Sequence, residues 1–123
     1  MAVVNLTEDN FEPTISENSF VVVDFWAPWC GPCRTFGPVF EKVSDDHDDI
    51  VFAKVNTEDE QQIAAHFQIR SIPTLMIFRD QIIIFSQPGA LPEGSFRELL
   101  AKAGELDMEK VRADIAAQQG GAA

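Results

Sequence analysis

The sequence predicts an α/β protein built on a central mixed β-sheet flanked by helices. Near-continuous apolar runs, such as residues 20–26 (FVVVDFW), are typical of strands that are buried on both faces. Segments with apolar residues at helical spacing alternate with these runs, and this alternation favours parallel strands joined by helices. Two later runs are separated only by residues 79–81 (RDQ), a connection so short that the two strands must be antiparallel.

The first half of the chain is expected to supply a helix, a strand and a second helix. The first helix is the least regular and lies near residues 7–16, before the strand at 20–26. The second helix is predicted by an apolar stripe at helical spacing, formed by Phe36, Val39, Phe40 and Val43. The join between this strand and this helix therefore falls at residues 27–33.

The second half continues the alternation and ends it with a hairpin and a helix. The expected elements are a strand at 51–55 (VFAKV), a helix at 58–67, strands at 74–78 and 82–85, and a helix at 93–103. The last helix has Phe96, Leu99 and Leu100 on its buried stripe.

Composition excludes several classes of protein. Hydrophobic residues make up 46% of the 123 residues and include ten Phe, enough for the core of one domain without disulfide or metal staples. The formal net charge is −11, which argues against nucleic acid and anionic membrane as partners, because both bind clustered positive charge. No apolar run approaches the roughly 20 residues of a membrane span. We expect a monomer.

The N-terminal segment, residues 1–12, lacks the basic and apolar stretches of a secretory signal. A cytoplasmic location is therefore expected by default, and stable structural disulfides are unusual there. The two cysteines of the chain, Cys30 and Cys33, need another explanation.

These two cysteines fall where the strand at 20–26 is followed by a helix. Cys30 is expected near the helix N-cap, and Cys33 one turn inside and less exposed; residues three apart on a helix have Cβ atoms about 5–6 Å apart, close enough for a disulfide. Gly31 allows a tight turn and Pro32 suits an early helical position. The partial positive charge of the helix N-terminus stabilises a thiolate on Cys30. The pattern predicts a reversible dithiol centre, with Cys30 attacking and Cys33 resolving.

Other readings of the cysteine pair remain weaker. A zinc site normally needs four ligands, and His47 and His66 stand apart from the cysteines and from each other. No metal is expected within one chain, although a metal bridging two copies stays open. A purely structural disulfide is disfavoured because so short a loop constrains the unfolded chain little.

Three further residues draw attention because their types are unusual at their positions. Asp24 and Lys54 are charged residues within two neighbouring core strands, and burial of a carboxylate is costly without compensation. They form either a structural ion pair or a proton-handling pair beside the cysteines, since burial raises the pKa of a carboxyl group. Pro73 precedes the strand at 74–78, where it is either an ordinary strand-entry proline or a cis bond.

Four segments of the chain resemble the thioredoxin family over residues 3 to about 104: VVDFWAPWCGPC, FAKVNTED, IRSIPTLMIF and PGAL. The resemblance implies the thioredoxin fold. It implies that Cys30 attacks a substrate disulfide, that Cys33 resolves it, and that Asp24 handles protons with Lys54 near it. It also implies a cis Pro73 that faces the cysteines, and an apolar patch that docks client proteins, formed by Trp29, Gly31, Pro32, Ile72, Pro73, Gly89 and Ala90.

The implied function is reduction of disulfides in client proteins. Electrons would come from NADPH through thioredoxin reductase, and no cofactor is expected on this chain. A thioredoxin-like chaperone or scaffold subunit is the alternative, but such a protein does not need both cysteines, Asp24 and Pro73. An oxidant or isomerase is less favoured with Gly-Pro between the cysteines. Ser71 and Pro88 depart from the commoner family pattern, which puts partner preference in doubt.

The last nineteen residues, 105–123, extend past the domain expected at 1–104. Asp107 is a plausible N-cap, and Met108, Val111 and Ile115 form a narrow apolar stripe. A short extra helix is therefore expected at about 108–118, ended by Gly120 and Gly121 and followed by a disordered tail. Its stripe either packs on the same chain or docks a partner or a second copy.

Overall fold

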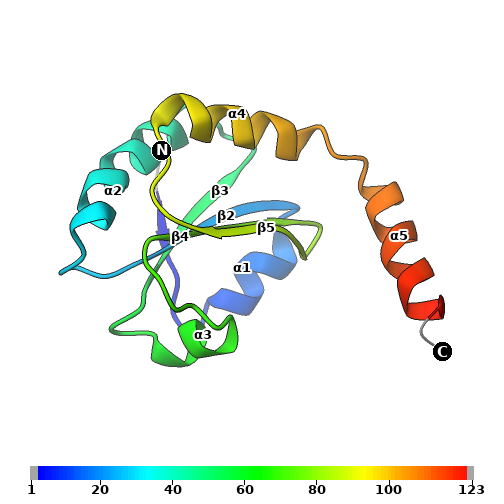
Figure 1. Cartoon of the computed structure of the whole chain (residues 1–123), viewed down its shortest axis with the longest axis horizontal. Helices are drawn as coiled ribbons and strands as arrows, with labels where there is room; N and C mark the ends of the chain where they lie inside the picture. Colours follow the sequence, from blue (N-terminus) through cyan, green and yellow to red (C-terminus); the bar gives the residue numbers. More distant parts are fainter. Residues whose placement is uncertain (1–2, 122–123) are drawn as a thin grey trace.

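The computed structural model describes residues 3–121 and shows one five-stranded mixed sheet with the strand order β1-β3-β2-β4-β5 (Figure 1). The strands are β1 (Val4–Asn5), β2 (Phe20–Trp26), β3 (Val51–Asn56), β4 (Thr74–Arg79) and β5 (Ile82–Pro88). β3 pairs in parallel with both β1 and β2, while β4 runs antiparallel to β2 and β5. The expected mixed sheet, with its antiparallel hairpin at one edge, is confirmed.

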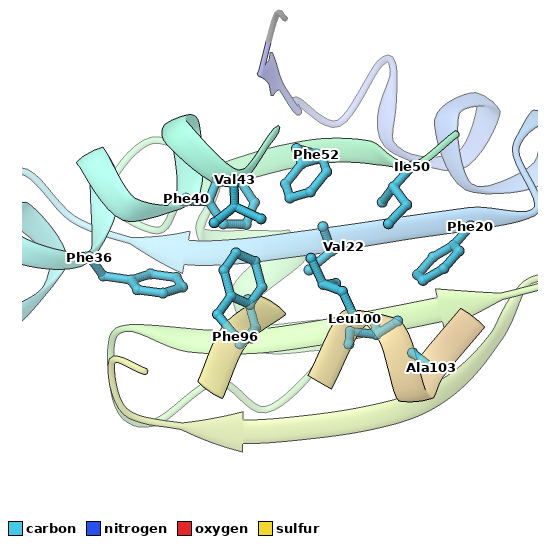
Figure 2. Close-up of a cluster of buried hydrophobic side chains, with 12 residues drawn as sticks. Phe20, Val22, Phe36, Phe40, Val43, Ile50, Phe52, Phe96, Leu100 and Ala103 are labelled. Atoms are coloured by element: carbon cyan, nitrogen blue, oxygen red, sulfur yellow. The ribbon is translucent and has the colours of Figure 1, made fainter. Parts of the chain in front are cut away.

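Helices cover both faces of this sheet. They are α1 (Phe11–Glu17), α2 (Gly31–Ser44), α3 (Gln61–His66), α4 (Glu93–Gly104) and α5 (Met108–Gly121). One core cluster joins α2 and α4 to the sheet, and a second joins α1 and α3 to the opposite face. Figure 2 shows the first cluster, in which phenylalanine rings of the strands and helices lie against one another.

The central position of β2 explains its near-continuous apolar sequence. Its side chains alternate between the two faces, so that Val22 packs under α2 and α4 while Val21 and Val23 pack on the other side. The same alternation places Asp24 on the face that α2 covers. The strand is therefore buried on both faces, as the apolar run predicts.

Three local features of the first 90 residues differ from the expectations, each because of one interaction or one short pairing. β1 was not expected; it is two residues long and is defined by its pairing with β3. The helix expected from residue 58 begins only at Gln61, because the Asn56 side chain accepts the Glu58 backbone N–H at 3.0 Å and holds a turn there. The hairpin turn contains only Asp80 and Gln81, since Arg79 still pairs with Ile82.

The C-terminal extension forms the expected helix, α5, which projects beyond the end of α4 (Figure 1). The Asp107 carboxylate accepts the backbone N–H groups of Glu109 and Lys110, as an N-cap does. Met108 is buried and Arg112 forms an ion pair of 2.8 Å with Asp80, so the first turns of α5 pack on the same chain. The helix continues through Gly121, so the end expected at about residue 118, with Gly120 and Gly121 ending the helix, is wrong. The rest of the tail expected to be disordered lies outside the described residues.

Within residues 3–121, no helix combines the length and the apolar character needed to cross a bilayer.

Candidate active site

The two cysteines lie at the start of α2, at the carboxyl end of the central strand β2. Cys30 is the N-cap residue, with extended backbone (φ −86°, ψ 115°), and its Sγ accepts the Cys33 backbone N–H at 3.2 Å. Pro32 stands at the start of the helix, as expected from its fixed φ. The Cα atoms of Cys30 and Cys33 are 5.2 Å apart and the two sulfurs form a disulfide. The sulfur of Cys30 therefore faces the positive end of the helix dipole.

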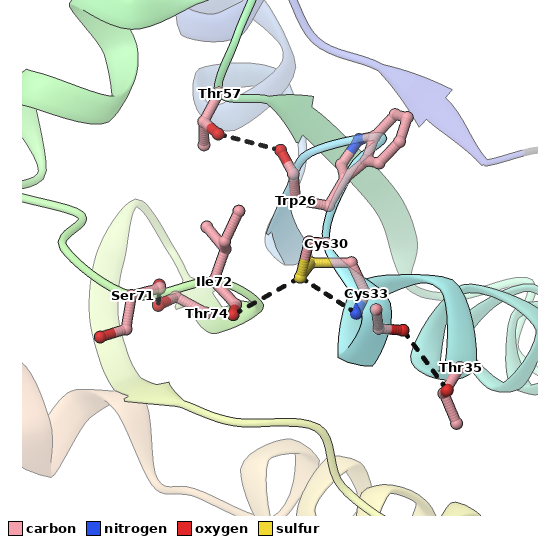
Figure 3. The surroundings of a disulfide bond; sticks show 9 residues. Trp26, Cys30, Cys33, Thr35, Thr57, Ser71, Ile72 and Thr74 are labelled. Atoms are coloured by element: carbon pink, nitrogen blue, oxygen red, sulfur yellow. Dashed lines mark hydrogen bonds between the residues drawn. A yellow bond between two sulfur atoms is a disulfide. The ribbon is translucent and has the colours of Figure 1, made fainter.

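The loop that leads into β4 reaches this disulfide (Figure 3). The Ile72–Pro73 peptide bond is cis, and the Ile72 carbonyl oxygen lies 3.6 Å from Cys30 Sγ. The Pro73 carbonyl in turn accepts the Gly89 backbone N–H at 2.8 Å. Gly89 has φ +109°, a left-handed conformation that favours glycine. The segment after β5 is thereby fixed beside Pro73.

The residues expected in the docking patch come from these three segments. Around the disulfide, Trp29, Gly31, Pro32, Gly89 and Ala90 are exposed, Ile72 is half-buried and Pro73 is buried. Trp29 is 64% exposed, more than the other exposed large apolar side chains of residues 3–121, which are Val4, Ile83 and Leu106. The patch is thus an apolar rim around a covered disulfide.

The exposed fractions of the two cysteines are nearly equal, 4% for Cys30 and 3% for Cys33. The expectation that Cys33 is less exposed is therefore not useful for telling them apart. What distinguishes the two sulfurs is their surroundings: only Cys30 lies at the N-cap and against the Ile72 carbonyl.

Asp24 is fully buried and neither of its carboxylate oxygens has a hydrogen-bond partner. Removal from water raises the pKa of Asp24 from 3.8 to about 7, and the positive charge of Lys54 acts against that rise. Lys54 is the parallel-ladder partner of Asp24 on β3, but its Nζ lies over the Trp26 ring, 4.9 Å from the centroid. The pair is therefore not a close structural ion pair, and Asp24 can exchange a proton near neutral pH.

One contact of the docking patch was not expected from the sequence. The Trp29 indole N–H donates to a Glu58 carboxylate oxygen at 2.8 Å and so orients the most exposed aromatic ring of the patch. The only signal in the sequence was the position of Glu58, just past the end of a strand that neighbours β2. Thr57 adds a second link, since its backbone N–H and hydroxyl both donate to the Trp26 carbonyl.

The two histidines are placed by ring contacts rather than by ligand geometry. His47 lies near Phe52 and His66 against Phe67, with ring centroids 6.2 and 4.8 Å apart. Across residues 3–121, no group of three or more His, Cys, Asp or Glu side chains is arranged to hold a metal ion.

A redox-active disulfide at a helix N-terminus, beside a cis-proline loop and an apolar rim, defines a thiol-disulfide oxidoreductase. Comparison with known proteins gives the family. The thioredoxin family profile matches residues 2–102, and the chain belongs to the thioredoxin family.

Curated relatives agree with this membership. The chain is 52% identical over 116 residues to "Putative thioredoxin 2" of Streptomyces coelicolor, covering 94% of this chain and 87% of that protein. It is 41% identical over 104 residues to a thioredoxin of Pyropia yezoensis, covering 83% of this chain and 97% of that protein. The Streptomyces match leaves only a few residues of this chain unaligned and so includes most of α5.

Solved structures show the same fold. The thioredoxin of Malassezia sympodialis superposes with a TM-score of 0.74 at 36% identity, covering 82% of this chain and 90% of that one. A thioredoxin of Plasmodium falciparum gives a TM-score of 0.76 at 31% identity, covering 81% and 98%. The expected fold, family and thiol-disulfide oxidoreductase activity are confirmed.

Proposed function

We propose that this protein reduces disulfides in client proteins with Cys30 as the attacking thiolate and Cys33 as the resolving thiol. The observation that carries this assignment is the position of Cys30 Sγ, which accepts a backbone N–H at the N-terminus of α2. Such a site stabilises a thiolate, and the thiolate is the nucleophile in disulfide exchange.

The reaction takes place in two exchange steps. The Cys30 thiolate attacks one sulfur of the client disulfide, forms a mixed disulfide and releases the other client sulfur as a thiolate. The Cys33 thiolate then attacks the Cys30 sulfur, releases the second client thiolate and closes the Cys30–Cys33 disulfide. Two electrons pass from the dithiol to the client, and the two released client thiolates take up protons.

Asp24 is the group that we assign to proton transfer in the second step. Cys33 must lose its proton to attack, and a carboxyl group with a pKa of about 7 is partly ionised at neutral pH. The positive charge of Lys54 favours the ionised form and so keeps this pKa from rising further. The proton would reach Asp24 directly or through water.

The apolar rim is the surface on which we expect the client to dock. Trp29, Gly31, Pro32, Gly89 and Ala90 are exposed around the disulfide. An extended client segment could pair, as an added strand, with the backbone beside Pro73. Docking of this kind depends on shape and backbone rather than on one client sequence.

The oxidised protein must then be reduced again. Members of this family are generally reduced by thioredoxin reductase, and we propose the NADPH-dependent reductase as the electron donor. A reducing role fits the cytoplasm, where thiols are kept reduced. We propose that the protein acts there as a monomer.

The test of the proposed function is a coupled assay on the purified chain. With NADPH, thioredoxin reductase and insulin as a disulfide-containing client, NADPH should be consumed and the client thiols should appear in equal amounts. The double variant Cys30→Ser/Cys33→Ser is the blank. A wild-type rate no higher than this blank would reject the reductase and favour the chaperone or scaffold alternative.

A truncation tests our proposal that residues 1–104 form the catalytic domain. Removal of residues 105–123 should leave the rate of small-disulfide reduction within about twofold, because the hydrogen bonds and ion pairs of residues 105–121, the described part of the extension, do not reach the site described above. The truncation should lower the free energy of unfolding by roughly 1–3 kcal/mol, because Met108 is buried and its burial is lost.

Urea unfolding and the reduction rate should be measured on the same truncated preparation. Arg112→Gln in the full chain is the matched control, since it removes only the exposed ion pair with Asp80 and should cost about 1 kcal/mol or less. Loss of activity in a truncated protein that remains folded would contradict the proposed domain boundary.

A further inference from the structure

Most of the positively charged side chains of this acidic protein have a partner within the fold. Five of its nine Lys and Arg side chains form ion pairs: Lys42, Arg97, Lys102, Lys110 and Arg112. Arg79 donates to the Ala103 carbonyl at 2.6 Å, and Lys54 lies over the Trp26 ring. Each of these cations therefore has a partner within the fold.

The two remaining cations are Arg34 and Arg70. Both are exposed, and within the described residues neither side chain makes an ion pair, a hydrogen bond or a ring contact. Arg34 directly follows Cys33 in the first turn of α2. Arg70 lies two residues before Ile72, whose carbonyl contacts Cys30 Sγ. In a chain of net charge −11, the two unpaired cations thus stand on the two segments that meet at the disulfide.

The surface beside Arg70 is also suited to a polar group. A pocket of about 190 Å³ borders the Pro73 loop and is lined by Arg70, Ser71, Thr74, Ser86 and Pro88, among others. It offers hydroxyl groups and one guanidinium group next to the position where an extended client segment would pass. The Thr74 hydroxyl already donates to the Ser71 carbonyl, which leaves the exposed hydroxyls of Ser71 and Ser86. An arginine with two such hydroxyl neighbours is well suited to bind a carboxylate.

The opposite charge stands at the Trp29 side of the patch, where Glu58 holds the indole N–H. A client carboxylate near Trp29 would be repelled by Glu58, whereas carboxylates near Arg34 and Arg70 would be attracted. The patch is therefore polarised, and acidic residues fit it on the sides formed by the α2 turn and the Pro73 loop.

We propose that Arg34 and Arg70 select client segments that have acidic residues next to the disulfide. This inference rests on the proposed function and names the class of client that the same site prefers. The overall negative charge acts against it at long range, but salt screens charges beyond about 8 Å at physiological ionic strength. The contacts of the two arginines lie within that distance and decide the preference.

The test uses three disulfide-bridged peptides that differ only in the residues flanking the cysteines, which are Asp, Ser or Lys. Reduced protein, freed of other thiols, is mixed with each peptide and the second-order rate constant is measured. At about 0.1 M salt the Asp peptide should react roughly three- to tenfold faster than the Ser peptide, as expected for two exposed charge pairs. The Lys peptide should react more slowly than the Ser peptide. At about 1 M salt the ratios should approach one.

The variant Arg34→Gln/Arg70→Gln should abolish the preference for the Asp peptide. The ratio of two peptides within one variant cancels any effect of Arg34 on the reactivity of the neighbouring thiols. The matched control is Lys102→Gln/Lys110→Gln, which removes the same charge from two exposed positions on α4 and α5 and should keep the wild-type ratio.

Three results would overturn the proposal while the reductase function stands: equal rates for the Asp and Ser peptides, a faster Lys peptide, or a preference that persists without the two arginines. Loss of the preference in the lysine control would do the same, because it would assign the effect to net charge. If no peptide is reduced at all, the proposed function itself fails and this inference with it.

Discussion

Cys33→Ser should convert the protein into one that holds its clients in stable mixed disulfides. Cys30 keeps its position at the N-cap of α2, where its thiolate can still attack a client disulfide. Without the Cys33 sulfur, no neighbouring thiol can displace the client from Cys30. The mixed disulfide should therefore accumulate to nearly one client per protein molecule, and catalytic reduction should fall to the level of the uncatalysed exchange.

Cys30→Ser should show the opposite behaviour. The remaining sulfur belongs to a residue in the first turn of the helix and lacks the N-cap position. This variant should neither reduce insulin nor trap it. Non-reducing electrophoresis and mass spectrometry of the two variants, each incubated with the same client, give the comparison directly.

The double variant Cys30→Ser/Cys33→Ser sets the background of the trapping experiment. The exposed fractions of the two cysteines are nearly equal, so exposure alone predicts equal trapping by both single variants. Helix position predicts trapping by Cys33→Ser alone. Equal trapping would therefore refute the assignment of the attacking sulfur to Cys30.

The parts of the fold that follow from periodicity could be read from the sequence. β2 is buried on both faces and is apolar throughout apart from one residue, and α2 has an apolar stripe that packs under α4. β1 could not be predicted, because two exposed residues show no periodicity and the strand exists only through its pairing with Ala53 and Lys54 of β3. Elements defined by their own side chains were predicted, whereas one defined by its partner was not.

The length of the hairpin turn also could not be predicted from the local sequence. Asp80 and Gln81 both have positive φ, 51° and 69°, a conformation that usually requires glycine or asparagine. The apolar runs alone predict a connection of three residues, 79–81. Strand pairing between Arg79 and Ile82 outweighs the local preference of these two residues and keeps the turn tight.

Some features of the candidate site could be predicted from the sequence, and others could not. Cys30 and Cys33 were found from their spacing, and Asp24 from its charge within an apolar run. The contact between Trp29 and Glu58 was not, because it joins residues far apart in the sequence. Trp26 and Asn56 are ladder partners, so the segments that leave β2 and β3 side by side bring Trp29 and Glu58 together. Tertiary pairing creates this contact, and no local pattern indicates it.

Asp24→Asn should stabilise the folded protein, and the gain should grow as the pH rises. The unfolded chain releases the Asp24 proton near pH 3.8, but the folded protein keeps it until about pH 7, because burial disfavours the charged form. The free energy of unfolding therefore falls as the pH rises from 3.8 to 7, and the full loss is present above pH 7. The pKa difference corresponds to roughly 4 kcal/mol, at about 1.4 kcal/mol per pKa unit.

The asparagine side chain cannot ionise, so the variant does not lose this free energy of unfolding as the pH rises. Its amide is also left without partners, which lowers the net gain by roughly 1–3 kcal/mol at every pH. The cost of the unpaired amide is the same at every pH, so it cancels when the two proteins are compared at two pH values. The change of relative stability with pH is therefore the better test. Between pH 5 and pH 9, the stability of the variant relative to wild type should increase by roughly 2–3 kcal/mol.

The measurement is urea unfolding of the oxidised proteins, in which the disulfide-bonded cysteines do not titrate. Asp59→Asn, which changes an exposed carboxylate, is the matched control and should shift stability by less than about 0.5 kcal/mol at either pH. A relative stability of Asp24→Asn that does not change with pH would show that Asp24 is ionised in the folded protein throughout this range.

The same variant should be slower as a reductase. If Asp24 takes the Cys33 proton, its loss should lower the rate of client reduction near pH 7 by about tenfold to a hundredfold, at or below the low end of what positioned proton-transfer groups contribute. The deficit should shrink at higher pH, where the solvent removes the thiol proton. The variant could instead be more stable at pH 9 and still reduce insulin at the wild-type rate at pH 7. That result would show that Asp24 is a buried charge without a role in catalysis. Stabilisation together with a slower reaction is the result we expect, because the carboxylate that is costly to bury is the one placed to accept the proton.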